Sequence, residues 1–373
     1  MRKIWLAVLI VVAIAAAGYT VRNSAIGIAT SEAEAAVEWA PGSFAEIMAQ
    51  AKAADKPVMI DFYATWCGPC KRLTRETYSD AAVVTFTDEN LICAKIDVDE
   101  EENKTLTEHY MIYNYPTILF VKPDGSEIDR RVGFLPPDEY LQLMKDYLAG
   151  VNTYDDYLRR VEAAPDDLEL NFTVGEKLTH RLERDAAHRH LERAIELDPQ
   201  NEQGKAVDAL FALADLHRKL AIRNADETEW PHAVGYVRQA IESFPSKETN
   251  EHGLRRIAYF HKKAGSLEAA ADVYLEIIVL KPEDPGALNA FAWFCAEKGI
   301  ALEEATEKAK LAVELSEGAA GYLDTLAEVY HASGMHEEAI ATIQEAIAKD
   351  PEDKYLKDQL EKFEAAMKGH AEA

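Results

Sequence analysis

The sequence predicts two regions of different fold class, an α/β domain followed by an all-α array of repeated helix pairs. The first observation is a Cys-x-x-Cys motif, Cys67 and Cys70, placed between a predicted buried strand and a predicted helix. The second is a pattern of small, apolar and proline residues that recurs at the same offsets over residues 168–353. A length of 373 residues also favours two domains over one.

The strand and the helix give the motif its chemistry. Residues 57–63 form an apolar run typical of a buried strand, and residues 71–77 are predicted to be helical. Two cysteines at such a junction can close and reopen a small disulfide. A helix N-terminus stabilises a thiolate, so we expect Cys67 at the cap to be the nucleophile. Cys70 lies one turn into the helix, where we expect a more buried, resolving thiol.

The main alternative for this motif is half of a zinc site. Zinc needs two further ligands at suitable spacing. Cys93 and Cys295 are isolated in the sequence, and no histidine lies near either of them in a ligand pattern. We therefore expect neither a metal nor another cofactor, and we expect both cysteines to be buried free thiols.

Several positions besides the motif make residues 44–148 resemble a thioredoxin domain. Asp61, six residues before Cys67, matches the buried acid of that family, and Lys95 matches the lysine beside it. The resemblance implies that Asp61, helped by Lys95, handles the proton of Cys70. The alternative is that Asp61 is a surface residue of its strand. Its neighbours are apolar, however, and a buried acid has a raised pKa.

The resemblance also implies a client groove. Tyr115 and Pro116 match the family's cis-proline motif. The expectation of a cis bond there rests on the resemblance alone, because most X-Pro bonds are trans. Gly133 matches a glycine that lines the groove. The residues expected to bind substrate are Trp66, Gly68, Pro69, Tyr115, Pro116 and Gly133. Within the same family, residues 77–83 after the active-site helix and residues 97–99 after the next strand look like the C-terminal reductase domain of a periplasmic membrane electron transporter.

The N-terminal residues predict export. Two basic residues, Arg2 and Lys3, precede an apolar run over residues 4–17 and a small-residue exit, as in a signal peptide. An uncleaved anchor over residues 1–21 is the alternative, since a membrane span needs about 20 apolar residues. Residues 22–43 are expected to be a linker, and residues 44–150 the α/β domain.

Residues 151–373 are predicted to form a repeat array. About five copies over residues 168–353 match the 34-residue tetratricopeptide pattern of paired helices, and a charged capping helix follows over residues 354–368. Small residues let the two helices of a copy approach, and proline commonly ends the second helix. A plain helical bundle is the alternative. Such arrays usually present a surface to a peptide or a protein, so we expect a protein partner.

The charge balance excludes one class of partner. The chain has a formal net charge of −26, and residues 151–373 alone carry 44 acidic and 26 basic side chains, a net of −18. Neither half contains a basic patch, so nucleic acid is not an expected partner. The acidity could select basic clients, although solvated helix faces also explain it.

These observations predict an exported thiol–disulfide oxidoreductase, either soluble in the periplasm or anchored in the inner membrane. Reduction of client disulfides is favoured because Cys-Gly-Pro-Cys resembles thioredoxin, whose potential is about −270 mV against about −120 mV for a periplasmic oxidant. A reductase in that compartment needs a membrane electron donor. The alternatives are a disulfide isomerase or chaperone, and a scaffold for envelope assembly with a secondary redox role.

Overall fold

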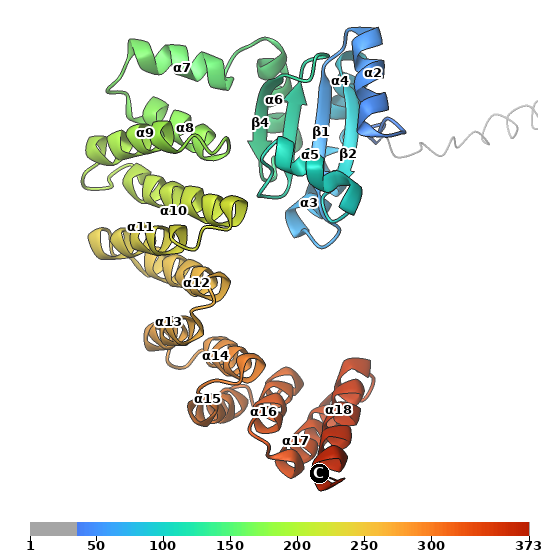
Figure 1. Cartoon of the computed structure of the whole chain (residues 1–373), viewed down its shortest axis with the longest axis vertical. Coiled ribbons are helices and arrows are strands. Elements are labelled where there is room, and N and C mark those ends of the chain that lie inside the picture. Colours follow the sequence, from blue (N-terminus) through green and yellow to red (C-terminus); the bar gives the residue numbers. More distant parts are fainter. Residues whose placement is uncertain (1–35, 373) are drawn as a thin grey trace, which may run out of the picture. The chain divides into compact units, whose positions relative to one another are not determined.

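The computed structural model describes residues 36–372, which fall into two compact units, one ending at Asp156 and the other beginning at Tyr157 (Figure 1). The predicted signal peptide or anchor at residues 1–21 lies outside the described residues. Within residues 36–372, no helix combines the length and the apolar character that crossing a bilayer requires.

The first unit is built on a four-stranded mixed sheet in the order β2-β1-β3-β4. Its strands are β1 (Val58–Tyr63), β2 (Ile92–Asp97), β3 (Thr117–Val121) and β4 (Glu127–Val132). β1 pairs in parallel with β2 and antiparallel with β3, so it is a central strand. Its residues Val58 to Phe62 are buried, because both faces of a central strand are covered.

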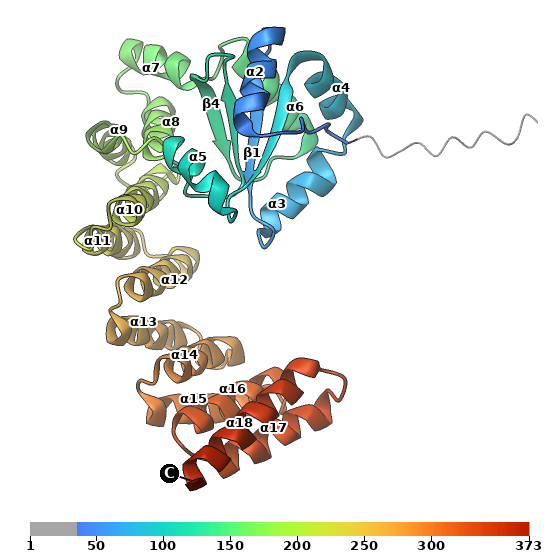
Figure 2. The same cartoon turned by 45° about the vertical axis from the view of Figure 1, so that its right-hand side comes forward.

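Helices cover both faces of this sheet (Figure 2). The helical elements are α2 (Phe44–Ala54), α3 (Gly68–Arg72), a π-turn (Leu73–Thr77), α4 (Ala81–Asn90), a 3-10 turn (Glu101–Asn103), α5 (Lys104–His109) and α6 (Pro137–Leu148). Alternate residues of β1 point to opposite faces. Ile60 packs with α2, whereas Met59 packs with α4 and α6. After β1 ends at Tyr63, a short loop leads to Cys67 at the start of α3.

The end of the predicted linker is part of this unit. Val37 is buried in the core with α4 and α6, and its amide donates a hydrogen bond to the carbonyl of Tyr78. The amide of Ala40 donates to the carbonyl of Cys93, at the β2 edge. The linker prediction was therefore wrong over residues 37–40, because an apolar side chain and two long-range hydrogen bonds hold this segment on the domain.

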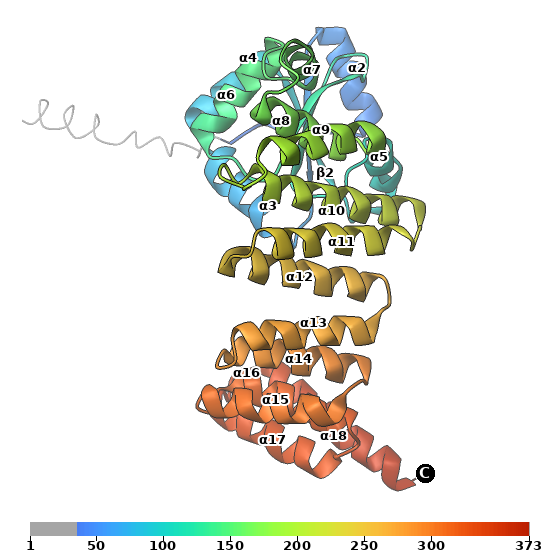
Figure 3. The ribbon, with the colours of Figure 1, turned by 90° about the vertical axis from the view of Figure 1, so that its left-hand side faces the viewer.

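The second unit is an array of five helix hairpins and a last helix, preceded by α7 (Tyr154–Ala163), which spans the junction (Figure 3). The hairpins are α8 (Leu168–Thr179) with α9 (Arg184–Leu197), α10 (Lys205–Asn224) with α11 (Glu229–Ser243), α12 (Lys247–Lys263) with α13 (Leu267–Leu280), α14 (Pro285–Lys298) with α15 (Leu302–Leu315), and α16 (Ala320–Ala332) with α17 (His336–Lys349). The last helix is α18 (Lys354–Glu372).

Small residues bring the helices of these hairpins together. A Cβ atom added to Gly175 in α8 would lie 2.6 Å from Cγ of Leu191 in α9, which is closer than carbon atoms can approach. Ala187 and Ala194 on the facing side of α9 are fully buried. One continuous apolar core then runs from α10 to α18. The predicted fold class, an α/β domain followed by an all-α tetratricopeptide-like array, is confirmed.

Candidate active site

Cys67 and Cys70 lie at the start of α3 and are joined by a disulfide bond. Cys67 is the N-cap of this helix, and its Sγ accepts a hydrogen bond from the Cys70 amide at 3.1 Å. Pro69 occupies the first turn, where a missing N–H is tolerated. Both cysteines are 4% exposed, so the predicted deeper burial of Cys70 is not seen in the disulfide-bonded pair.

Exposed side chains surround the pair on its outer side. Trp66 is 65% exposed, although its Nε1 donates a 2.7 Å hydrogen bond to Asp99. Its ring also meets the ring of Tyr115 edge-on at a centroid distance of 6.0 Å. Gly68 and Pro69 are exposed as well. The neighbours of Cys67 in the motif are therefore accessible to a partner protein, whereas Cys67 itself is buried in the disulfide-bonded pair.

Two groove positions predicted from the resemblance lie side by side. The Tyr115–Pro116 peptide bond is cis, as expected. The amide of Gly133 donates a 2.9 Å hydrogen bond to the carbonyl of Pro116, which places the two residues together at the start of β3. Gly133 has a φ of +89°, a backbone conformation that residues with a side chain rarely adopt, so the turn after β4 requires glycine.

Asp61 lies in β1, the strand that leads into the cysteine motif, and is buried beside Lys95 and Tyr78. Its exposed fraction is 1%, and burial raises its pKa from 3.8 to about 7, although the charge of Lys95 and the hydroxyl of Tyr78 partly offset that rise. Lys95 faces Asp61 across the parallel β1–β2 pair, with Nζ 3.8 Å from Oδ2. The other carboxylate oxygen, Oδ1, has no hydrogen-bond partner among the described residues. Near neutral pH this carboxyl group can therefore bind or release a proton.

Aromatic rings hold the Lys95 ammonium, and the sequence analysis did not identify them. Nζ lies 4.8 Å from the ring centroid of Tyr63, 5.0 Å from that of Trp39 and 5.7 Å from that of Tyr78. It also donates a 3.0 Å hydrogen bond to Thr74. Cation–π attraction thus holds the ammonium among these rings. Trp39 was missed because it stands in the segment predicted to be a linker.

The two remaining cysteines are buried free thiols, as predicted. Burial, together with the charge of Asp88, raises the pKa of Cys93 to about 12. Burial and the charge of Glu304 do the same for Cys295 in α14. Neither thiol ionises at neutral pH, so both are unsuited to nucleophilic attack.

A disulfide-bonded Cys-x-x-Cys pair at a helix cap, with a buried acid of raised pKa in the strand before it, is the arrangement of a thiol–disulfide oxidoreductase. Residues 44–148 match the family model of a thioredoxin-like domain. The same region is 38% identical over 94 residues to thioredoxin of Mycoplasmoides gallisepticum, covering 24% of this chain and 84% of that protein. Through this domain the chain belongs to the thioredoxin family.

The other similarities are partial. The chain is 33% identical over 132 residues to the thiol:disulfide interchange protein DsbD of Salmonella typhimurium, covering 34% of this chain. It spans 23% of the length of that protein, and the same share of a disulfide isomerase-like relative. For the array, YrrB, a TPR protein with an unusual peptide-binding site, is 17% identical over 56% of this chain and all of its own, with a TM-score of 0.36.

Proposed function

We propose that this chain reduces disulfide bonds of extracytoplasmic proteins through Cys67 and Cys70, and that its helical array recruits the client or a partner. One observation carries the redox part, namely a cysteine pair at a helix cap with a buried carboxyl group, of pKa about 7, in the strand that leads into it. The similarity to DsbD and thioredoxin supports the reaction class.

The reaction balances as two successive exchanges. The Cys67 thiolate attacks one sulfur of the client disulfide and forms a mixed disulfide, and the other client sulfur leaves as a thiolate that takes up a proton. The Cys70 thiolate then attacks Sγ of Cys67. This step releases the second client thiol and leaves the Cys67–Cys70 disulfide. Two electrons have moved from the cysteine pair to the client.

Asp61 supplies the base for the second exchange. Cys70 must lose its proton before it attacks, and a carboxyl group whose pKa is about 7 is partly ionised at neutral pH. Proton acceptance is most efficient when the pKa of the base lies near the working pH. Lys95 favours the ionised form of Asp61, because its charge lowers the pKa that burial raises. We assign Asp61 as the general base and Lys95 as its positioning partner.

The surface around Cys67 is proposed to hold the client chain. Trp66, Gly68 and Pro69 form one side, and Tyr115, Pro116 and Gly133 form the other. Regeneration needs two electrons from outside this chain, and the predicted export signal points to a membrane electron donor. The expected location is the periplasm, either free after signal cleavage or anchored in the inner membrane.

Trapping tests this proposal. The Cys70→Ala variant of the full chain is expressed in the envelope of its host, where the mixed disulfide on Cys67 cannot be resolved. Specific proteins released from Cys67 by reductant support the proposal and name the clients. The matched control is Cys93→Ala, which leaves the pair intact and should trap nothing. An empty Cys70→Ala trap, with partners instead held non-covalently by the array, would favour an assembly scaffold.

A second measurement separates reductase from isomerase. A Cys67→Ala, Cys70→Ala variant has no redox activity but keeps the array. Suppression of client aggregation by this variant would favour the chaperone or isomerase alternative. The reductase proposal expects the double variant neither to reduce client disulfides nor to suppress aggregation. It also expects the wild-type chain, supplied with electrons, to convert client disulfides fully to thiols.

A further inference from the structure

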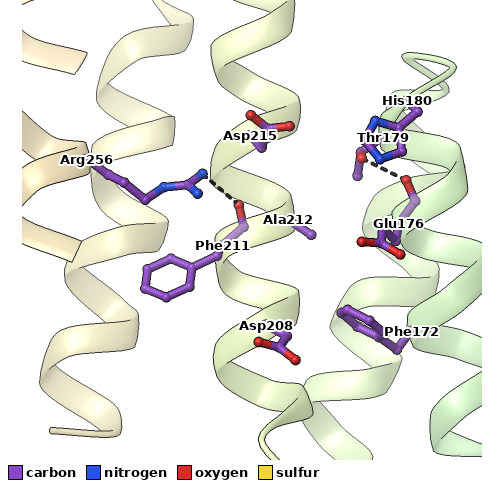
Figure 4. A pocket seen from close by; sticks show the side chains of 9 residues that line it. All are labelled: Phe172, Glu176, Thr179, His180, Asp208, Phe211, Ala212, Asp215 and Arg256. Carbon is purple, nitrogen blue, oxygen red and sulfur yellow. Dashed lines mark hydrogen bonds between the residues drawn. The ribbon is translucent and has the colours of Figure 1, made fainter. Parts of the chain in front are cut away.

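A pocket of about 380 Å³ opens between the first helices of three successive hairpins, α8, α10 and α12 (Figure 4). Phe172 and Glu176 come from α8, separated by one helical turn. Asp208 and Phe211 come from α10, and Arg256 comes from α12. The lining thus combines two phenyl rings with charged groups of both signs.

The acid at the inner end of the pocket is already neutralised. Asp215 in α10 binds Arg218 at 2.7 Å and Lys219 at 2.8 Å. Burial alone would raise its pKa, but the charges of Lys219 and Arg218 hold that pKa well below its usual range. Lys219 is itself 2% exposed, so this ion pair belongs to the core of the array. The negative charge of Asp215 is thus compensated by these two cations rather than available to a ligand.

Two other carboxylates are not neutralised. Within residues 36–372, neither Asp208 nor Glu176 makes a side-chain hydrogen bond or has a cationic group within 4 Å. Burial raises the pKa of Asp208, an effect that Lys205 only partly offsets. The ammonium of Lys205 is engaged elsewhere, 3.1 Å from Glu169 and over the ring of Phe172 at 4.3 Å. Among the described residues, these two acids therefore form no ion pair of their own.

The opposite wall offers hydrogen-bond donors. One Nη of Arg256 donates to the carbonyl of Phe211 at 3.2 Å, and the guanidinium lies 5.3 Å from the Phe211 ring centroid. Its Nε is buried and has no partner among the described residues. A guanidinium has five N–H donors, so several remain for an incoming acceptor. A peptide carbonyl is such an acceptor.

We propose that this pocket binds an arginine or lysine side chain of a partner protein, with its charge at Asp208 and Glu176, its stem against Phe172 and Phe211, and its backbone carbonyl at Arg256. The aliphatic stem and the cationic head of such a residue match a phenyl wall and two acids. This inference rests on the proposed function, in which the array recruits proteins, and it gives that recruitment a chemical class.

Two other occupants fit less well. Among the described residues, no group of three or more histidine, cysteine, aspartate or glutamate side chains is arranged to hold a metal ion. A free polyamine would satisfy the acids but would leave the donors of Arg256 unused. The net charge of −18 over residues 151–373 also attracts basic segments over long distances.

Saturation-transfer NMR with the full chain tests the inference, because it detects weak ligands of a 41.6 kDa protein. The probes are acetyl-Leu-Arg-Leu-amide and the same tripeptide with citrulline, which has the shape of arginine without its charge. We expect the arginine probe to bind at least about tenfold more tightly than the citrulline probe, since charge-assisted hydrogen bonds are about twice as strong as neutral ones. Its binding should also weaken with added salt.

The variants are Asp208→Asn and Glu176→Gln, each nearly isosteric with the wild-type residue. The matched control is Glu345→Gln, at an exposed acid of α17 that makes no ion pair with any residue that the structure describes. The double variant should lose at least about tenfold in affinity for the arginine probe, whereas the control keeps it. Unfolding curves that match wild type confirm that the variants fold.

Three outcomes overturn the inference: no binding of the arginine probe, equal binding of both probes, or unchanged binding by the double variant. Each leaves the proposed function standing if clients are still trapped on Cys67. Conversely, a Cys67→Ser variant should bind the arginine probe as wild type does. The failure of one proposal is therefore distinguishable from the failure of the other.

Discussion

Replacing Asp61 by Asn should stabilise the redox domain, and the gain should depend on pH. The wild-type carboxyl group is 1% exposed and has a pKa of about 7 in the folded domain, against about 4 in an unfolded chain. Folded protein thus keeps a proton that unfolded protein releases above about pH 4. Asn has nearly the same shape and no charge to bury.

The sign and the size follow from proton linkage. Between about pH 4 and pH 7 the unfolded state binds fewer protons than the folded state, so wild-type stability falls as the pH rises, by ~1.4 kcal/mol per pH unit. Over about three units the loss approaches 4 kcal/mol. The Asp61→Asn variant has no such loss. Its advantage over wild type should be near zero at about pH 4 and about 4 kcal/mol at about pH 8.

Each unit contains its own reporter for this measurement. Cys93 and Cys295 are buried free thiols, one in the redox domain and one in the array. Oxidised full-length chain is equilibrated in urea at each pH, and a short alkylation pulse at a fixed pH then labels whichever thiol has become accessible. Mass spectrometry of the two peptides gives separate unfolding curves for the two units.

The internal control is Cys295, whose unfolding curve should not respond to Asp61→Asn at any pH. A stability difference at Cys93 that stays constant from pH 4 to pH 8 would refute the raised pKa, and with it the role of Asp61 as a base near neutral pH. A shift of the Cys295 curve would show that the effect is not local to the buried acid.

Three further predictions concern charge and packing. Lys95→Met removes about 1–4 kcal/mol of attraction across 3.8 Å to the buried carboxylate, so the pH–rate profile of disulfide reduction should move to higher pH by about one to three units. Gly175→Ala should destabilise its hairpin by about 1–3 kcal/mol, whereas Gly235→Ala, whose added Cβ meets nothing within 4 Å, should be neutral or stabilising by up to about 1 kcal/mol, as read from thermal unfolding. Lys219→Met removes the buried ammonium that pairs with Asp215 and should cost about 3–5 kcal/mol in urea unfolding, most of which a second change, Asp215→Leu, should restore.

The redox motif could be predicted because its signals are local. A strand, two cysteines and a helix are adjacent in the chain, and Asp61 lies in that strand, six residues before Cys67. Similarly, the helix hairpins could be predicted because each is formed by two helices that are consecutive in the sequence. The cis bond at Pro116 came from family resemblance, since nothing in the local sequence distinguishes it from a trans bond.

Long-range contacts account for what was missed. Trp39 belongs to a short segment without helical or strand periodicity, and only the folded domain brings it over Lys95. Cys67 and Cys70 are equally buried in the disulfide-bonded pair, so the expected difference between them could not be derived from position in the helix alone. Likewise, the sequence does not show which acids of α10 form ion pairs, because this depends on how α10 packs against its neighbouring helices.

The order in which strands pair has a consequence for how the two units fold. β1 pairs with β3, so Val58 must find Val121 after most of the domain sequence has been made, and contacts this distant in sequence form slowly. Each hairpin of the array instead closes from adjacent segments, and the next hairpin only has to dock on it. The array can grow helix by helix behind a ribosome or a translocation pore, while the redox domain must wait for its third strand. Until that strand pairs, the strand that leads into the cysteine motif lacks one of its two neighbours in the sheet.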